Sequence, residues 1–482
     1  MAVVRPQLLE MKKKVPIGLT AVLVTLLNSL ILFSQDENYN SENFGNRSIL
    51  LSGNVTGSVD DLGLTYYNPA RIAMVENPAF SIDAKAYQYV NLKIKNAVGD
   101  NSELSSTRFQ GIPSMLSGTF KIKALKDHHF AYTFLSRAKT NFNFNYSTGI
   151  ETGDILEENE GGETFIGEIQ FGFKETDEWY GLTWGKLITE NFSVGVSVFA
   201  SVYNYQGANL LTFTTLGESQ NVNFYFNQFA VRQESYGMFW KVGLAWKLSK
   251  ISLGLNIDLP YWEVHSNGKF KYQETLAGIS NTEDIFKFAD FNNISSSRKV
   301  PLGISIGSGV PIGKSTLHLK VDWHNKVDEY DRLTLPLIED GTGPDKSFIF
   351  ISKLRSVINF GLGAEVFITE KYKVFGSFST DFSAAQNNAN VFDIVGDSEN
   401  DVNLDFDYLH LGFGFEINFN WGHLVLGTTY SSGFADFSQK LGFPDPNNPV
   451  DNEDDITKLH LTRWRGIIGA KIPVFMRTVE IK

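Results

Sequence analysis

The sequence predicts an all-β fold, a transmembrane antiparallel β-barrel of about 14 strands with an N-terminal plug in its lumen. From about residue 79 to the end, apolar and polar residues alternate with a period of two, which is the pattern of half-buried strands. The clean runs are about ten residues long, whereas strands of soluble sandwiches usually have about 5–6 residues. Tilted strands of about ten residues match a bilayer core, and the 39 Phe, 18 Tyr and 8 Trp residues are enough for its interfacial girdles. In lipid every backbone group must pair within the protein, so such strands close into a barrel.

Residues 1–34 have the pattern of an export signal. Lys12, Lys13 and Lys14 follow Met11, which is the more natural initiator, and an apolar run from Val15 to Phe33 precedes the polar residues Gln35 and Asp36. A basic start, an apolar stretch and a small residue predict cleavage after about Ser34. A single membrane anchor is the alternative, because the run is close to the roughly 20 residues that a spanning helix needs.

Residues 35–78 do not alternate, and we expect them to form the plug, with residues 79–482 forming the barrel. The triplets Asn68-Pro69-Ala70 and Asn77-Pro78-Ala79 lie close together. Proline fixes φ and donates no backbone hydrogen bond, so each triplet is a chain reversal or the start of a short helix. Ordinary surface turns are the alternative, but a barrel of this size needs its lumen filled, and such corners would fold a short plug back on itself.

Within the barrel the alternation is clearest at residues 240–259. Apolar residues occupy every second position of residues 240–248 and of residues 251–259, and Ser249-Lys250 separates the two runs, which predicts a hairpin. Residues 141–146 put every aromatic on one face and every amide on the other. Further strands are expected near 128–135, 163–173, 178–187, 192–198, 222–229, 302–307, 317–323, 358–368, 372–382, 409–419, 424–430 and 461–472.

Polar segments between these strands predict long loops on one side of the barrel. They are residues 149–163, 274–300, 383–407 and 435–460, whereas short breaks such as Glu370-Lys371 predict turns on the other side. Phe406 and Tyr408 are out of phase with Leu409 and Leu411, which predicts a bulge near Tyr408.

The N-terminal segment resembles that of a known family. Gly53, Val59-Asp60-Asp61 and Tyr66-Tyr67-Asn68-Pro69-Ala70 are similar to the hatch of FadL-like outer-membrane transporters, and Bacteroidota barrels related to the PorV-like component of type IX secretion have a similar element. The resemblance implies a barrel of 14 strands in the bacterial outer membrane, a hatch in its lumen, and inward movement of fatty acids or aromatic hydrocarbons with lateral release through the wall. It covers some twenty residues.

The sequence departs from the family pattern in two places. Arg71 stands where these hatches usually have Gly after the triplet, and the chain ends without the terminal aromatic common in such barrels, Phe475 lying seven residues in. Arg71 is expected to pair with an acidic residue of the wall or with a ligand carboxylate. The plug or ligand-binding residues predicted are Tyr66, Tyr67, Asn68, Pro69, Ala70 and Arg71.

Composition and motifs exclude several other classes. The net charge of −12 argues against a nucleic-acid partner, and the absence of cysteine excludes disulfides and thiolate metal sites. Gly303-Ile304-Ser305-Ile306-Gly307 fits the nucleophile elbow, but no helical pattern follows it, and residues 308–315 only approach a phosphate-binding loop. His128 and His129 point to opposite faces of a strand, so they cannot chelate one metal together. Acidic residues such as Asp451 and Asp454 are expected to be solvated rather than to bind Ca²⁺.

Three functions remain, and no cofactor is expected. The first is passive uptake of a small hydrophobic compound, fatty-acid-like or aromatic, through a barrel in contact with outer-membrane lipid. The second is a barrel without transport that docks partner proteins, as in type IX secretion. The third is an enzyme, which we do not expect because no nucleophile and base are placed together; protein partners are not predicted.

Overall fold

The computed structural model describes residues 38–75, 79–95, 103–153, 162–218, 220–278, 284–343, 345–386, 406–437, 457–473 and 478–479. All of them belong to one compact unit, Phe33–Lys482. The predicted signal, Asn77-Pro78, Phe475 and the acidic residues near Asp451 lie outside the described residues. No helix among the described residues is long and apolar enough to cross a membrane.

The prediction of an all-β fold is confirmed, since the described residues form twenty strands and three short helical segments. The helical segments are α2 (Asn46–Leu50), α3 (Leu64–Tyr67) and the 3₁₀ helix η1 (Pro69–Ala73). The strands are β1 (Ala79–Lys95), β2 (Glu103–Ile122), β3 (His128–Ser147), β4 (Glu151–Gly153), β5 (Glu163–Thr189), β6 (Phe192–Leu216), β7 (Val222–Lys247), β8 (Ser252–Asp258), β9 (Trp262–Ala277), β10 (Ile285–Ile294), β11 (Gly303–Ile312), β12 (Ser315–His324), β13 (Val327–Leu333), β14 (Phe350–Leu354), β15 (Val357–Phe367), β16 (Tyr372–Asp381), β17 (Asp407–Phe419), β18 (Gly422–Phe437), β19 (Thr457–Pro473) and β20 (Thr478–Val479).

Antiparallel pairing links most strands to their neighbours along the chain. The pairings run from β1 through β2, β3, β5, β6, β7, β8, β11, β12, β15, β16, β17 and β18 to β19, and β19 also pairs with β1. Strand β7 pairs with β8 near one end and with β9 over the rest of its length, and β10 extends the sheet beyond β9. Strands β13 and β14 form a separate two-stranded sheet.

The expected hairpin at residues 240–259 is present, with Lys247 paired to Ser252 across the turn. Two expectations about where strands end were wrong. Residues 163–173 and 178–187 belong to the single strand β5, because the polar residues between them also pair with β6. A strand can continue through polar residues where its outward face does not contact an apolar environment. Residues 274–300 are not one loop, because β9 continues to Ala277 and the apolar and polar alternation around Phe288 forms β10.

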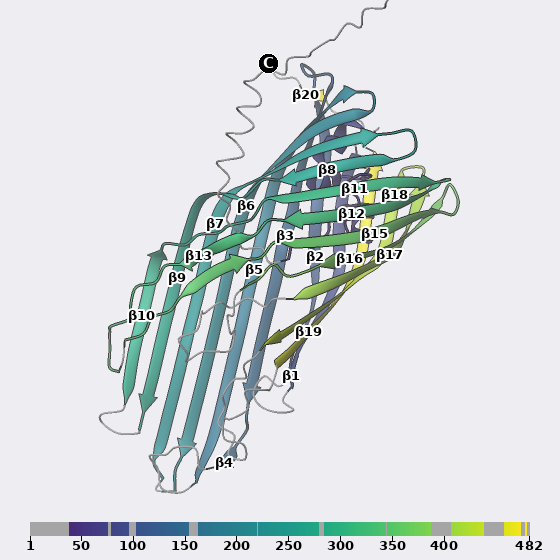
Figure 1. Ribbon diagram of the computed structural model, residues 1–482. Helices are drawn as coiled ribbons and strands as arrows, with labels where there is room; N and C mark the ends of the chain where they lie inside the picture. Colours follow the sequence, from purple (N-terminus) through teal and green to yellow (C-terminus); the bar gives the residue numbers. More distant parts are fainter. Residues whose placement is uncertain are drawn as a thin grey trace, which may run out of the picture. The chain divides into compact units, whose positions relative to one another are not determined.

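Strands β5, β6 and β7 have 27, 25 and 26 residues and run past the ends of the short strands β11, β12 and β15 (Figure 1). We call residues 178–189, 192–202 and 236–247 of these strands their proximal half, which carries the short turns. Residues 163–177, 203–216 and 222–235 are their distal half. The side chains alternate between a buried, inward face and a more exposed, outward face along both halves.

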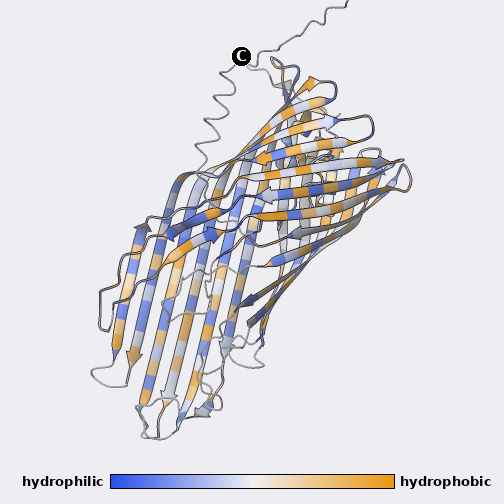
Figure 2. Ribbon diagram, viewed as in Figure 1, coloured by the Kyte–Doolittle hydropathy of each residue, from blue (hydrophilic) through white to orange (hydrophobic). Residues whose placement is uncertain are grey.

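The two halves carry opposite chemistry on these faces. In proximal β6 the outward residues are Phe192, Val194, Val196, Val198, Ala200 and Val202, and the inward ones are mostly Ser and Gly. In distal β6 the outward face begins with Asn204 and Gln206, and the inward face with Tyr203 and Tyr205. No register shift separates the halves in the pairing of β6 with β7, so apolar and polar residues exchange faces along a continuous strand. Figure 2 shows hydrophobic and hydrophilic residues alternating along the long strands.

The predicted bulge near Tyr408 is wrong for the same reason. The pairings of β17 with β16 and β18 run through Tyr408 without a shift. Phe406, Tyr408 and His410 are all inward and buried, and Leu409 and Leu411 are outward. The apparent change of phase in the sequence is therefore a change in the chemistry of the inward face, from aromatic to polar.

Candidate functional site

The N-terminal segment, residues 38–75, is hydrogen-bonded to the inward faces of strands that are far apart in the sequence. Ser197 Oγ of β6 donates to the Thr65 carbonyl oxygen at 2.7 Å. Asn54 Nδ2 donates to the carbonyl oxygens of Leu362 and Phe378, on β15 and β16, at 3.1 and 3.0 Å. Small polar side chains and free backbone groups of the wall thus satisfy the backbone and amides of a segment that has little regular structure of its own.

Glycines of the wall provide the room for this segment. A Cβ added to Gly195 or Gly243 would overlap Pro69 or Asn68, and one added to Gly254 would overlap the Thr56 carbonyl oxygen. The same holds around the rest of the wall for Gly185, Gly307, Gly309, Gly361, Gly412, Gly414, Gly427 and Gly469, which meet Ile72, Gly57, Ser58, Asn54, Leu50 or Asn46. These eleven residues, which we call the wall glycines, lie on nine strands and let the N-terminal segment reach the backbone of the sheet.

The first Asn-Pro-Ala triplet is a docking corner against β6 and β7. Asn68 Oδ1 accepts from Ala70 N at 3.1 Å and so caps η1, which begins at Pro69. Asn68 Nδ2 donates to the carbonyl oxygens of Thr56, within the segment, and Leu244, on β7, at 2.9 and 3.0 Å. Ser193 Oγ of β6 donates to the Ala70 carbonyl oxygen at 2.8 Å. The triplet is therefore buried rather than a surface turn.

The two tyrosines before the triplet have different contacts. Tyr67 Oη donates to Asn43 Oδ1 and accepts from Phe44 N, both at 3.0 Å, and its ring packs on Gly53, whose φ of 71° suits glycine. Tyr66 packs edge-on against Phe44 and faces Trp179 of β5, and Lys241 Nζ lies 4.1 Å from the centre of its ring. Tyr67 thus holds the segment together, whereas Tyr66 faces the wall.

Asp61, from the hatch-like pattern, organises the start of the segment. Helix α2 has no side-chain cap of its own, and Asp61 Oδ2 accepts from Arg47 N and Ser48 N at 2.7 and 2.8 Å. Asp61 Oδ1 accepts from Gly63 N at 2.9 Å. The guanidinium of Arg47 forms ion pairs with Asp60 and with Glu365 of β15. One carboxylate therefore closes residues 47–63 into a loop that an arginine fixes to the wall.

Arg71 contacts the N-terminal segment itself, and its expected contact with a ligand carboxylate stays a prediction. Its Nε donates to the Val59 carbonyl oxygen at 3.0 Å, and its Nη1 lies 3.6 Å from Met74 Sδ. The described residues give it no ion pair. Burial, with a smaller contribution from Arg47, lowers the pKa of the Arg71 guanidinium to about 10, so it stays charged at neutral pH. Arg71 braces the segment internally.

Two hollows lie against the N-terminal segment. A small cavity of about 40 Å³ is lined by Tyr66, Trp179, Phe239 and Lys241 among others. A larger pocket of about 500 Å³ lies on another side of the segment, where Leu64, Ile72 and Val75 meet β2, β3 and the turn ends of the sheet. Its lining combines apolar residues with the lysines Lys121, Lys247 and Lys471 and with the carboxylates of Asp60, Asp61 and Glu190.

The inward face of the distal half forms an apolar cluster. It includes Phe142, Phe144, Phe171, Phe173, Tyr203, Tyr205, Phe229, Phe270 and Tyr272 of the long strands, and Leu333, Phe348 and Phe350 at the two-stranded sheet of β13 and β14. Phe348 lies 5.2 Å from Phe270 and 4.8 Å from Tyr272 between ring centres. An aromatic lining thus continues from the small cavity away from the turns.

A buried ion pair lies where the two halves meet. Arg298 Nη2 contacts Asp177 Oδ2 at 2.8 Å, both side chains are fully buried, and the guanidinium stacks on Tyr203 at 3.9 Å from its centre. Ser201 Oγ donates to Asp177 Oδ1 at 2.6 Å. The two opposite charges are paired with each other, which is how such buried charges are tolerated.

The remaining motifs have structural contacts. Gly303 to Gly307 lie inside β11, with Ser305 buried and Ile306 60% exposed, so the segment is not a strand-to-helix elbow. Residues 308–315 complete β11 and turn into β12. His128 Nδ1 accepts from Trp184 Nε1 at 2.7 Å, whereas His129 lines the larger pocket. Among the described residues no His, Asp and Glu side chains are grouped so as to hold a metal ion.

The wall glycines are the functional residues that sequence reasoning missed. Their signal was present, because glycine recurs at alternate positions of several predicted strands, as at Gly195, Gly243 and Gly254. The prediction of these strands uses their apolar positions alone. A cluster of strands with glycine on the face opposite the apolar one indicates close approach of another backbone.

The antiparallel strands of the described residues define the fold class of outer-membrane β-barrel channels. Solved structures bear this out at the level of fold. The chain is similar to the Pseudomonas putida toluene transporter TodX, with a TM-score of 0.55, 12% identity, and coverage of 90% of this chain and 99% of that one. It is also similar to the Ralstonia pickettii toluene transporter TbuX, with a TM-score of 0.55, 11% identity, and coverage of 91% of this chain and 100% of that one. A Pseudomonas aeruginosa FadL homologue is similar with a TM-score of 0.54, 11% identity, and coverage of 90% of this chain and 99% of that one. No family model matches the chain, and no curated protein matches its sequence.

Proposed function

We propose that this chain is a closed, 14-stranded transmembrane barrel of the bacterial outer membrane, in which residues 38–75 are a lumenal plug, and that it takes up small hydrophobic compounds passively. The observation that carries the proposal is the N-terminal segment seated on wall glycines of nine strands, beside an aromatic inward face. The pairing of β19 with β1 supports closure of the fourteen strands. The likeness to hydrocarbon and FadL-type transporters supports the same class.

The outward face of the proximal half supports the membrane span. From Phe192 to Val202 every outward residue of β6 is apolar, and Leu182, Ile306 and Phe413 are about 60% exposed on other strands. Ten steps at about 3.3 Å, tilted by about 40°, cover roughly 25 Å of height, which is the apolar band of such barrels. Tyr180, Tyr236 and Trp262 lie near its distal edge as an aromatic girdle.

The connections orient the barrel. Short turns lie at the proximal ends, for example between Lys247 and Ser252, and in outer-membrane barrels short turns face the periplasm. The distal half then projects from the cell. The N-terminal segment lies in the proximal half, so a solute from outside meets the aromatic cluster first, then the cavity at Tyr66, and last the pocket at Ile72.

The chemistry of this route is partition and needs no catalysis. Water disfavours a hydrophobic solute, so an aromatic inner face concentrates it. The cavity at Tyr66 holds only about 40 Å³, so passage requires the segment to move by small adjustments of its contacts. Both a fatty-acid-like chain and an aromatic ring satisfy these requirements.

The pairing of β2 with β3 leaves a seam in the distal part of the wall. Strand β2 pairs with β3 between Met115 and Phe120, although β3 continues beside β5 as far as Ser147. Beyond Leu135 a hydrogen bond from Arg108 Nη1 to the Asn141 carbonyl oxygen, at 2.9 Å, bridges the described residues of the two strands. The seam lies outside the proposed apolar band, so lateral release into lipid is proposed from the resemblance of the N-terminal segment alone. The alternative of a barrel that docks partner proteins gains no support from the structural likeness.

The test compares solute movement in wild type and in the double variant Asn68→Ala/Pro69→Ala. Each protein is reconstituted in liposomes, and entry of radiolabelled toluene and oleate is measured beside leakage of a small sugar. The double variant removes the cap of η1 and its bond to β7, so hydrophobic entry and sugar leakage should both change. The matched control Gly376→Val adds methyl groups where a Cβ meets nothing within 4 Å.

Wild type should admit at least one of the two hydrophobic solutes faster than protein-free liposomes, and the control should equal wild type. Folded wild type that admits neither solute contradicts the proposed uptake. A double variant with wild-type entry and leakage contradicts the role of the corner in the plug.

A further inference from the structure

The outward face of the distal half carries a trough of about 590 Å³ that the uptake route does not use. Its floor is made of small residues in register across neighbouring strands, because Gly172 pairs with Ala208 and Ala208 with Ala230. The backbone of the sheet is therefore close to the surface along this row. The row continues to Lys271 on β9.

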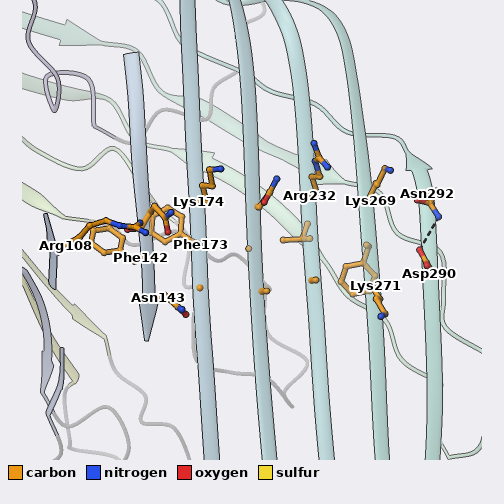
Figure 3. Close-up of a pocket in the computed structure, with 18 residues that line it drawn as sticks. Arg108, Phe142, Asn143, Phe173, Lys174, Arg232, Lys269, Lys271, Asp290 and Asn292 are labelled. Atoms are coloured by element: carbon orange, nitrogen blue, oxygen red, sulfur yellow. Dashed lines mark hydrogen bonds between the residues drawn. The ribbon is translucent and has the colours of Figure 1, made fainter. Parts of the chain in front are cut away.

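A row of cations and amides borders this floor. Lys174 pairs with Gln206, Gln206 with Arg232, and Arg232 with Lys269, so four strands contribute one line of polar side chains. Figure 3 shows Lys174, Arg232 and Lys269 side by side on these strands, with Lys271 next to the floor. Arg108 and Asn292 lie at opposite ends of the residues drawn in Figure 3, and Asn143 also lines the trough.

Neighbouring carboxylates offset only part of the charge of the trough, and one of them, Asp290, lies opposite Lys271 in the register of β10 and β9. Arg232 forms an ion pair with Glu234, and Asp290 accepts a hydrogen bond from Asn292 Nδ2 at 3.1 Å. Lys174, Lys269 and Lys271 form no ion pair with any residue that the structure describes, and all three are exposed. Three ammonium groups therefore surround a shallow depression in a chain whose net charge is −12.

The height of the trough adds a second constraint, which rests on the membrane position proposed above. On β7 the girdle residue Tyr236 is four residues from Arg232, and on β5 Glu178, in the same row as Tyr236, is four residues from Lys174. Four steps at about 3.3 Å, tilted by about 40°, place the cations about 10 Å outside the apolar band. This is the level of the headgroups of the outer leaflet.

We propose that this trough binds the phosphorylated sugar headgroup of an outer-leaflet glycolipid. The phosphates contact Lys174, Lys269 and Lys271, the amides donate to sugar hydroxyls, and a sugar ring lies flat on the row of Gly and Ala. Ammonium groups attract phosphate, and the attraction is effective at a surface where several act together. Small floor residues fit a ring-shaped group better than a free ion, which would need no floor.

The test uses the full chain in mild detergent, titrated with hexa-acylated diphosphoryl lipid A and with the same lipid after removal of both phosphates. Bound lipid is counted by native mass spectrometry. Wild type should bind the diphosphorylated lipid at least about tenfold more tightly, and added salt should weaken this preference. The variant Lys174→Gln/Lys269→Gln/Lys271→Gln should lose it.

The matched control removes three exposed lysines at the short turns, Lys250→Gln/Lys314→Gln/Lys371→Gln, and should keep the preference. The proposal is overturned if the trough variant, folded by its heat-modifiable gel mobility, keeps the preference. It is also overturned if both triple variants lose it equally, or if millimolar inorganic phosphate abolishes it. Hydrophobic solute entry is measured on the same preparations: failed entry with an intact preference contradicts only the proposed uptake, and the reverse contradicts only the trough.

Discussion

The proximal and distal halves of β5, β6 and β7 are continuous strands with opposite faces. In the proximal half the inward residues are small and polar, such as Ser193, Gly195 and Ser197, and the outward ones are apolar. In the distal half Phe171, Tyr205 and Phe229 are inward, and the outward face carries Lys, Arg, Asn and Gln. The exchange happens over a single row of residues, near Asp177.

The difference shows that the partner of each face selects its chemistry. The proximal inward face contacts a segment of irregular backbone, whose polar groups need donors such as Ser197 Oγ. The distal inward face packs aromatic rings on rings, among them those of Phe348 and Phe350, and Gln233 Nε2 there donates to the Ser297 carbonyl oxygen at 3.1 Å. The two outward faces differ in chemistry because, in the proposed placement, the proximal one contacts lipid and the distal one lies outside the membrane.

The largest expected effect is at the junction of the two halves. Asp177→Ala leaves the buried Arg298 guanidinium without the carboxylate that it contacts at 2.8 Å. Removing one partner of a buried pair costs about 3–5 kcal/mol, so the free energy of unfolding should fall by that amount in a denaturant titration of the detergent-folded protein. Glu370→Ala, at an exposed ion pair with Lys314, is the control and should change it little. If the two variants lowered the free energy of unfolding equally, the buried ion pair would not contribute more to stability than the exposed one.

The next prediction separates the outward faces. Leu182 is 62% exposed in the proximal half, and Leu182→Arg should cost about 2–4 kcal/mol if lipid surrounds it. Gln206→Arg, on the outward face of the distal half, should change stability little because the site is solvated. Folding titrations into lipid vesicles measure both. Similar costs for the two variants would contradict the placement of the apolar band.

A third variant tests the inward face of the proximal half. Gly243→Val places side-chain atoms where Asn68 and Pro69 lie, and overpacking of this kind costs about 1–3 kcal/mol. The cost should appear as faster proteolysis within residues 38–75, because the segment can lift while the strands stay paired. Gly376→Val should leave proteolysis at the wild-type rate. Protection that is unchanged in Gly243→Val would mean that the wall glycine is not needed for docking.

The smallest effect is expected from one hydrogen bond between the segment and the wall. Ser197→Ala removes the donor to the Thr65 carbonyl oxygen, together with the 2.7 Å hydrogen bond to Thr183 Oγ1 within the wall, and should loosen the segment by about 1 kcal/mol, measured as faster amide exchange at residues 64–67. Gln206→Ala, on the outward face of the same strand, serves as the control. If amide exchange at residues 64–67 were unchanged in Ser197→Ala, these residues would be held against the wall by packing alone.

Sequence patterns predicted much of the fold, and their errors have one cause. The hairpin of β7 and β8 follows from local alternation and a two-residue break, both readable over twenty residues. The supposed bulge at Tyr408, the division of β5 and the loop assigned to residues 274–300 all came from treating a change of polarity as a change of structure. A strand tolerates any side chain that suits what it faces, so polarity alone does not mark its end.

The sequence by itself determined that most of the chain is strand and that the N-terminal segment is something else, because backbone periodicity and proline act locally. It also singled out Asn68-Pro69-Ala70, whose turn chemistry is local too. Only the tertiary structure decided that these residues dock on Gly195 and Gly243, and that Phe142 and Phe144 point inward. An alternation of period two defines two faces of a strand, but it does not tell which of the two faces points inward. The inward face is decided by residues that the fold brings together from distant parts of the chain.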